Sequence, residues 1–416
     1  MAENLIKLIK RNLPLLASLG GFLLGYSNGI IGSALLFIKP IFQLSDFSAG
    51  LIASIVIIGT MLGIIIASGL TDRWGRRFFI SISSLIFMLG FVMSAFAVNS
   101  HILLCGRFLA GIGIGIALVV VPLYLVEMAP TKWRGAYIAT FQLAITLGSF
   151  TGCAFSFWLA HYAAWRWMFG CGVVWALCLF MSSLFLPAVS KLPEKKLPES
   201  IVSVKMADIF QSRFYRPFLI GIGISILQQI TGINAIMYFA PQILQSTNNP
   251  SNLDAIFSAL ILMGSNFIFT IVSLFVLDFI GRRPVLIFSL LTQFIALAAL
   301  GILSKWQFDN AQIYFVTALM IYVFGYAVGL GPAGWLIISE IYPAQIRSKA
   351  IGITIMINNI AAFIVSVTFL DLLRWLTKSN TFWIYSFISL LGILFIIFIV
   401  PETKRKSLEE IERMSL

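Results

Sequence analysis

Long apolar runs recur along the whole chain, and short polar connections separate them. Each run has about 20 or more residues, the length that an α-helix needs to cross the ~30 Å hydrocarbon core of a bilayer. The runs lie near residues 13–36, 47–70, 78–98, 102–127, 135–160, 167–187, 216–244, 253–277, 284–304, 311–339, 349–373 and 381–400. The pattern predicts an all-α membrane protein with twelve transmembrane helices.

Composition and charge support a membrane protein. Hydrophobic residues make up 60% of the 416 residues, charged residues make up 11%, and the mean hydropathy is +0.99. A soluble domain does not have this balance. The net charge of +12 is not a sign of nucleic-acid binding, because 22 of the 28 lysines and arginines fall on one side of the membrane when both termini are placed inside. By the positive-inside rule, we expect a multi-pass protein of the cytoplasmic (inner) membrane with both termini in the cytoplasm and no nucleic-acid partner.

Two charged motifs occur twice. An Asp-x-x-Gly-Arg-Arg motif begins at Asp72 and again at Asp278, 206 residues later. A Glu-x-x-Pro-x-x-x-Arg motif begins at Glu127 and again at Glu340, 213 residues later. The prolines that follow the sixth and twelfth runs give a third match, with an offset of 214 residues. Repeated features at nearly one offset indicate a duplicated unit of six helices.

The duplication predicts the domain organisation. An even number of spans separates the two copies, so both have the same orientation in the membrane, which is the arrangement of parallel repeats. We expect an N-terminal six-helix bundle over residues 1–187 and a C-terminal bundle over 216–400. A polar, lysine-rich cytoplasmic linker over 188–215 joins them, and a charged cytoplasmic tail follows over 401–416.

The most unusual polar residues are three carboxamides inside the seventh run. Gln228, Gln229 and Asn234 lie among apolar residues, with Gly232 between them. An unpaired polar side chain in hydrocarbon costs roughly 4–8 kcal/mol on a cyclohexane scale, so these groups face protein, water or a ligand. A helix break near Gly232 would let both half-helices direct their amides into one cavity. The alternative is a hydrogen-bonded cluster between helices, and the local sequence leaves both open.

Two further features concern helix packing and breaks. The first run carries Gly21, Gly25 and Gly29 at four-residue spacing, which predicts close approach of a neighbouring helix. The tenth run contains the segment Gly329–Trp335, GLGPAGW, whose proline predicts a broken helix.

Metal, disulfide and enzyme chemistry are not indicated by the sequence. The four cysteines all lie in apolar runs without CxxC spacing, and the two histidines stand alone near helix ends. We therefore expect no cofactor, no metal site and no enzymatic activity. These residues are Cys105, Cys153, Cys171, Cys178, His101 and His161.

Six motifs together resemble the sugar porter family of the major facilitator superfamily, and the resemblance covers nearly the whole chain. They are DRWGRR, PLYLVEMAPTKWRG, QQITGINAIMYFAP, DFIGRR, GPAGWLIISEIYP and PETKRKSLEEI. The resemblance implies the major facilitator fold and a small-molecule sugar as the substrate. It also implies that the following residues bind the sugar: Gln142, Gln228, Gln229, Asn234, Tyr238, Asn266, Trp335 and Asn358.

The same resemblance gives the repeated charged motifs a role. In the family they form a cytoplasmic gate that ties the two halves together when the cytoplasmic side is closed. The alternative, that they are fixed markers of topology, accounts for the arginines but not for carboxylates at matched positions. The expected gate residues are Asp72, Arg76, Arg77, Glu127, Arg134, Asp278, Arg282, Arg283, Glu340 and Arg347.

Energy coupling is expected to depend on the first and fourth helices. Proton-coupled members of the family have an aspartate in the first helix that faces an arginine of the fourth. Arg107 matches that arginine, but Ser27 stands where the aspartate would be. Ser27 cannot titrate, which predicts a uniporter.

We therefore expect a carrier that moves a hexose or a pentose by alternating access and functions as a monomer in the lipid bilayer. Two alternatives remain: a sugar–proton symporter, and a membrane sugar sensor that hardly transports. The sequence does not identify the sugar, because epimers differ by a single hydroxyl.

Overall fold

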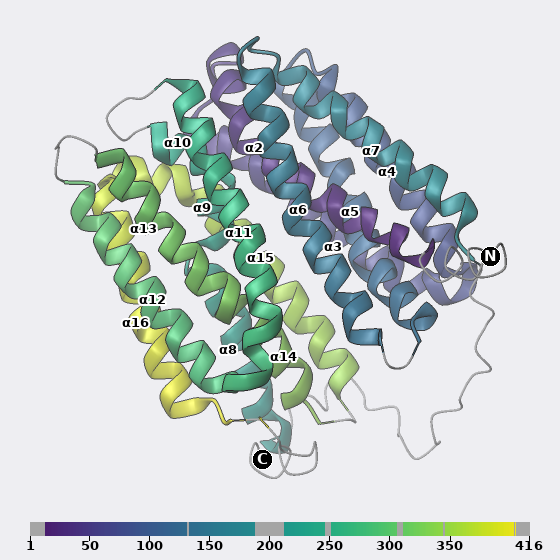
Figure 1. The fold of residues 1–416 in the computed structure, drawn as a ribbon, viewed down its shortest axis with the longest axis vertical. Helices are drawn as coiled ribbons and strands as arrows, with labels where there is room; N and C mark the ends of the chain where they lie inside the picture. The colour runs from purple at the N-terminus through teal and green to yellow at the C-terminus, as the bar shows by residue number, and fades with distance from the viewer. Residues whose placement is uncertain are drawn as a thin grey trace, which may run out of the picture. The chain divides into compact units, whose positions relative to one another are not determined.

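The computed structural model describes residues 13–130, 133–187, 212–245, 251–305, 311–343, 346–402 and 404. Across these residues the regular structure is entirely helical (Figure 1). Twelve stretches are long and apolar enough to cross a membrane, and they coincide with the twelve expected runs. The all-α, twelve-span fold class is confirmed. The expected linker up to residue 211 and the tail, apart from residues 401, 402 and 404, lie outside the described residues.

Six of the expected runs form the first part of the chain. The helices are η1 (Leu13–Ser18), α2 (Leu19–Ile41), α3 (Asp46–Trp74), α4 (Arg76–Ala95), α5 (Ser100–Met128), α6 (Arg134–Ala160) and α7 (Trp165–Phe185). The other six runs form α8 (Ser212–Ile230), α9 (Ile233–Tyr238), α10 (Ala240–Gln245), α11 (Asn252–Ile280), α12 (Arg282–Leu303), α13 (Ala311–Gly325), η4 (Tyr326–Leu330), α14 (Gly331–Ile341), α15 (Arg347–Trp375) and α16 (Thr377–Ile399).

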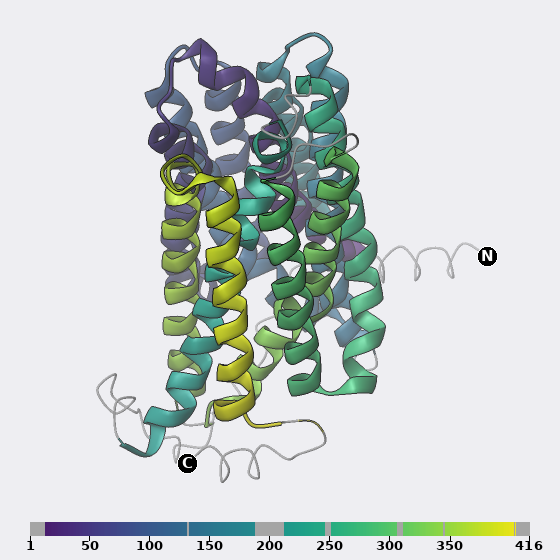
Figure 2. The ribbon, with the colours of Figure 1, turned by 90° about the vertical axis from the view of Figure 1, so that its left-hand side faces the viewer.

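The chain divides into two compact units. Unit 1 comprises Met1–Leu192, Met237–Ser246 and Pro250–Phe267, and unit 2 comprises Pro193–Ile236, Thr247–Asn249 and Ile268–Leu416. Within unit 2, α12 packs along α16 (Figure 1). Figure 2 shows α16 in yellow beside α8 and α15.

The seventh run is broken where the sequence predicted. Helix α8 ends at Ile230 and α9 begins at Ile233, and Gly232 between them has φ 93°. A residue with a Cβ rarely adopts this left-handed backbone conformation, so glycine fits the break. The carbonyl oxygen of Thr231 accepts a hydrogen bond from the Tyr322 hydroxyl, at 2.9 Å. A side chain of α13 thus satisfies a main-chain group that the break releases from the helix.

The tenth run departs from α-helical geometry slightly earlier than expected. The irregular turn is the π-helix η4, over Tyr326–Leu330, and it overlaps only the start of the predicted segment Gly329–Trp335. Pro332 lies in the first turn of α14, where a helix does not need its missing N–H. The proline therefore begins a new helix, and the π turn before it accommodates the change.

The glycines of the first run allow α2 and α6 to touch through their backbones. A Cβ added to Gly25 would lie 1.8 Å from the carbonyl oxygen of Ile145, and one added to Gly29 would lie 2.2 Å from that of Ser149. The Ser149 hydroxyl donates to the carbonyl oxygen of Gly25 across this contact, at 3.1 Å. The close approach that the spacing predicted is present.

We expect Gly25→Ala to destabilise the protein by roughly 1–3 kcal/mol, because the added methyl group overpacks a backbone contact that cannot yield. The measurement is thermal unfolding of the purified protein in detergent. Gly352→Ala is the matched control, since no atom other than those of its own stretch of α15 lies within 4 Å of the position that its Cβ would take. Equal stability of both variants would show that the α2–α6 contact is not tight.

Candidate functional site

Four carboxamides form one hydrogen-bonded chain in unit 2. Asn234 Nδ2 donates to Gln229 Oε1 at 2.7 Å, and Gln229 Nε2 donates to Asn358 Oδ1 at 3.0 Å. Asn358 Nδ2 then donates to Gln228 Oε1 at 3.2 Å and to the carbonyl oxygen of Ser225 at 2.9 Å. The chain joins α8, α9 and α15. The break at Gly232 brings Asn234 next to Gln229, and the amides bond one another between helices, which is compatible with both interpretations that the sequence left open.

The chain of amides is buried at one end and accessible at the other. Gln228 is fully buried, Gln229 and Asn358 are buried, and Asn234 is half-buried. In the hydrogen bonds between described residues, Asn234 uses one N–H donor. An amide has a second N–H and a carbonyl oxygen with two lone pairs, which leaves Asn234 with capacity for a ligand.

The buried end of the chain is tied to the irregular tenth span. Gln228 Nε2 donates to the carbonyl oxygens of Leu330, at 2.9 Å, and Gly331, at 3.1 Å. These are the carbonyl groups at the junction of η4 and α14. Trp335, on α14, is 40% exposed and therefore presents much of its surface. The carboxamides and the helix that carries Trp335 are thus one connected structure.

The remaining expected sugar ligands lie in unit 1. Gln142 is exposed on α6, and Asn266 is half-buried on α11. Tyr238 is buried at the end of α9 and lies within electrostatic range of Arg107. The structure therefore brings together Gln228, Gln229, Asn234 and Asn358 in unit 2. The other three expected ligands, Gln142, Tyr238 and Asn266, belong to unit 1.

Arg107 is buried in unit 1, and neutral groups surround its guanidinium. It donates to the Ser27 hydroxyl at 2.7 Å and to the Ser27 carbonyl oxygen at 3.3 Å. The carbonyl oxygens of Ile52 and Ala53 on α3 accept from it at 3.5 and 3.3 Å. Ser27 therefore takes part in holding the arginine, although it carries no charge.

The repeated charged motifs form matching ion pairs, one in each unit. Arg76 pairs with Glu127 at 3.1 Å, and Arg282 pairs with Glu340 at 3.2 Å. The second arginine of each motif binds main-chain oxygens near the end of the last helix of its six-helix bundle. Arg77 donates to the carbonyl oxygen of Ser183, at 3.0 Å, and Arg283 donates to that of Ile397. The two halves therefore share the same ion pair and the same arginine–carbonyl hydrogen bond.

Four of the ten expected gate residues are not seen in these ion pairs or helix-end contacts. Arg347 donates to the main-chain oxygen of Tyr342 at 2.9 Å, close to its own position in the chain. The side chains of Asp72, Arg134 and Asp278 lie outside the described residues.

Sequence reasoning missed the contact that Glu402 makes with α12. Its carboxylate accepts from the main-chain N–H groups of Arg282, at 3.2 Å, and Arg283, at 3.0 Å. The first N–H groups of a helix have no partner inside the helix, so Glu402 caps α12. The signal in the sequence is the acidic residue of the PET motif, which directly follows the twelfth span.

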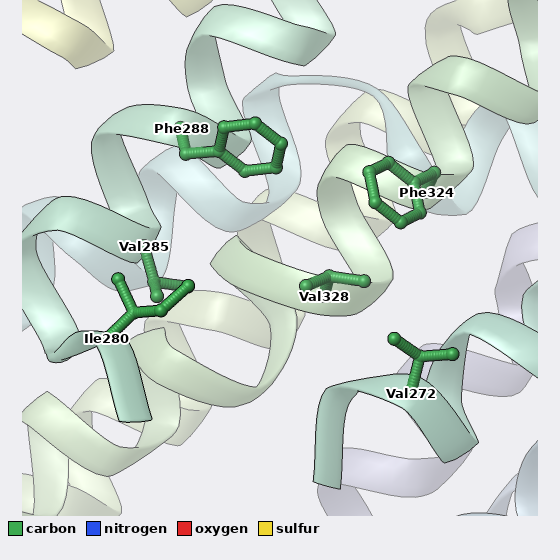
Figure 3. A pocket seen from close by; sticks show the side chains of 6 residues that line it. All are labelled: Val272, Ile280, Val285, Phe288, Phe324 and Val328. Carbon is green, nitrogen blue, oxygen red and sulfur yellow. The ribbon is translucent and has the colours of Figure 1, made fainter. Parts of the chain in front are cut away.

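An apolar cavity in unit 2 is unsuited to a sugar. Its volume is about 250 Å³, and Figure 3 shows that only hydrocarbon side chains line it. A buried hydroxyl without a partner is costly, so a polyhydroxylated ligand would lose its bonds to water there. The lining residues are Val272, Ile280, Val285, Phe288, Phe324 and Val328.

Comparison with known proteins identifies the family. The family model for sugar (and other) transporters matches residues 13–415. The galactose-proton symporter of Escherichia coli strain K12 is 32% identical over 430 residues, covering 96% of this chain and 92% of that protein. The glucose transporter GlcP of Staphylococcus epidermidis is 31% identical over 427 residues, covering 96% and 95%. The solved structure of the inward-open xylose transporter XylE from E. coli aligns with a TM-score of 0.83 at 27% identity, covering 97% of this chain and 99% of that one.

These relatives are membrane transporters and not enzymes, in agreement with the expectation from the sequence. The match extends over nearly the whole chain, and the fold and the repeated motifs agree with it. The chain belongs to the sugar (and other) transporter family and is a sugar porter of the major facilitator superfamily.

Proposed function

We propose that this sugar transporter moves a monosaccharide, a hexose or a pentose, by alternating access of a central site to the two sides of the membrane. The observation that carries the proposal is the chain of carboxamides from Gln228 to Asn234, with its accessible end at Asn234. Relatives named for galactose, glucose and xylose support this substrate class.

Carboxamides suit a neutral substrate that is rich in hydroxyl groups. A sugar hydroxyl both donates and accepts, and an amide offers both functions in one planar group. The indole of Trp335 adds an apolar face for the C–H side of the ring and an N–H for one oxygen. None of these sugar-binding side chains is charged. They can therefore bind the sugar weakly enough to release it, which a carrier requires.

We infer that both termini are cytoplasmic and that the protein lies in the bacterial plasma membrane. The uneven distribution of lysine and arginine supports this orientation. Relatives from Escherichia coli and Bacillus subtilis support the location. We also propose that a single chain is the transporting unit, because one chain carries both halves of the twelve-span fold.

The paired charges at the ends of the helices are proposed to act as the cytoplasmic gate. Arg76–Glu127 and Arg282–Glu340 each fix the start of one helix against the end of another within a single unit. Rigid helix ends of this kind can meet and separate as the carrier changes state. A fixed topology marker would need only the arginines.

Uniport is the proposed mode of transport, and proton symport is the competing one. Among the described residues, every hydrogen-bond acceptor of the Arg107 guanidinium is neutral, so none of them can release a proton during turnover. Relatives that are named as proton symporters, among them the galactose-proton symporter of Escherichia coli and the arabinose-proton symporter of Bacillus subtilis, favour symport. The two modes differ in whether the sugar accumulates against its gradient.

We expect Gln229→Ala and Asn234→Ala each to weaken sugar binding by roughly tenfold, because removal of one amide from a buried hydrogen-bonded site costs ~1–3 kcal/mol. The measurement is uptake of a radiolabelled hexose and pentose panel by cells without carriers of their own, followed by affinity measurements on the purified protein. Asn380→Ala, an exposed amide at the start of α16, is the control. Unchanged affinity in both site variants would assign the amides to helix packing alone.

We expect Glu340→Gln to open the cytoplasmic side more often, because loss of the Arg282 ion pair frees the end of α14 from the start of α12 and so loosens the proposed gate surface of unit 2. The measurement is the rate at which a maleimide labels Ser339→Cys, an exposed position on α14, in a background without the four native cysteines. The charge-reversed pair Arg282→Glu with Glu340→Arg should return the rate toward that of the parent. Identical rates for parent and Glu340→Gln would leave the pair with no role in gating.

We expect sugar uptake into liposomes to run only downhill and to be nearly independent of a proton gradient. Ser27→Asp should introduce pH dependence, because it places a titratable group against Arg107. Ser27→Asn, which is polar but not titratable, is the control. Accumulation above the external concentration that an uncoupler abolishes would establish symport and refute the proposed uniport.

A further inference from the structure

The π turn η4 is bound by a side chain of α12 in addition to its own main-chain hydrogen bonds. In a π-helix, each N–H pairs with the carbonyl five residues earlier, and Gly331 N–H does so with Tyr326. The same pattern relates Leu330 N–H to the carbonyl oxygen of Gly325. One hydroxyl from α12 hydrogen-bonds both of these main-chain groups.

That side chain is Ser289, which is fully buried. Leu330 N–H donates to the Ser289 hydroxyl at 2.8 Å, and the hydroxyl donates to the carbonyl oxygen of Gly325 at 2.7 Å. Gln293 Nε2, also on α12, donates to the Ser289 hydroxyl oxygen at 3.0 Å. A hydroxyl has one donor and two acceptor lone pairs, so its donor and one acceptor position bind the turn while the other acceptor position binds Gln293.

Leu330, whose N–H binds Ser289, is also bound to the candidate site through its carbonyl oxygen. The carbonyl oxygen of Leu330 accepts from Gln228, while its N–H donates to Ser289. Leu330 is therefore fixed between a peripheral helix and the carboxamide chain. The helix α14, which carries Trp335, begins at the next residue.

The repeat provides a comparison within the molecule. Ser83 on α4 lies 206 residues before Ser289 and occupies the equivalent place after the Gly-Arg-Arg motif. It is also fully buried, but its hydroxyl donates to Ile80 O in its own helix, at 3.0 Å. In that half, α5 continues as one α-helix over Ser100–Met128. A buried serine at this position bridges the neighbouring helix only in the half where that helix has a π turn.

Close packing accompanies these hydrogen bonds. A Cβ added to Gly329, in η4, would lie 2.2 Å from the Cβ of Ser289, and one added to Gly325 would lie 3.0 Å from the Ser289 carbonyl oxygen. Ser289 therefore lies directly against the turn, and its hydrogen bonds add direction to a contact that is already tight.

We propose that Ser289 is a positioning residue of the sugar site. Its hydroxyl fixes the π turn. The π turn then positions Gln228 and the helix that bears Trp335. The inference rests on the proposed function of the carboxamide chain as the sugar site. Ser289 itself touches none of the carboxamides in that chain and acts through Leu330.

The test compares Ser289→Ala with Ser83→Ala in the full-length protein. Hydrogen exchange of peptides covering residues 323–335 should be roughly three- to tenfold faster in Ser289→Ala, because one main-chain hydrogen bond loses its acceptor. Sugar affinity should fall by a similar factor. Ser83→Ala should change neither the exchange of this segment nor the affinity. Should Ser289→Ala fail to fold, Ser289→Cys keeps the side-chain volume with a weaker hydrogen bond and should give a smaller change of the same sign.

A double-mutant cycle separates positioning from general stability. If Ser289 acts through Leu330 on Gln228, adding Ser289→Ala to Gln228→Ala should weaken binding by less than twofold. Fully additive effects, or unchanged exchange over 323–335, would overturn the proposal. If the wild-type protein binds no sugar in the panel, the proposed function fails and the positioning role fails with it. Faster exchange in Ser289→Ala would then mean only that the residue clamps the turn.

Discussion

A main-chain N–H or C=O group inside hydrocarbon must have a hydrogen-bond partner, and this requirement determines most of the structure. An unpaired group costs several kcal/mol because no water is present to replace the partner. Continuous helices meet the requirement within themselves, and the described part of the chain is built from them. Each departure from a helix therefore needs a side chain from elsewhere, and those side chains mark the places where the protein has a specialised structure.

The two broken spans of unit 2 show how this works. At the first break, the Thr231 carbonyl is taken by Tyr322. At the second, Leu330 is bound by Ser289 through its N–H and by Gln228 through its carbonyl oxygen. Gln228 thus connects the second break to the carboxamide chain that begins beside the first. The polar groups that stabilise the breaks and the polar groups offered to a substrate belong to one network, so changes at a break are transmitted to the site.

Much of this could be read from the sequence because the governing patterns are local. Apolar run lengths gave the twelve spans, Gly232 marked a break, and the matched motifs at Asp72 and Asp278 revealed the repeat. The pairing of polar side chains could not be read in the same way. Asn358 bonds Gln228 and Gln229 across 130 and 129 residues, and nothing in the local sequence specifies that register. The break in the tenth span was predicted around Pro332, but the irregular turn lies before it, over Tyr326–Leu330. The proline itself fits the first turn of the next helix, so its position does not mark the break.

The ion pairs at Glu127 and Glu340 have a consequence for the independence of the two halves. Each pair closes inside one unit, with its arginine and carboxylate at matched places in the repeat. A bond that is complete within one half does not need the other, so each half fixes its own helix ends whatever the state of the carrier. The bridge from Ser289 to the tenth span has no counterpart at Ser83, so one half carries a restraint that the other lacks.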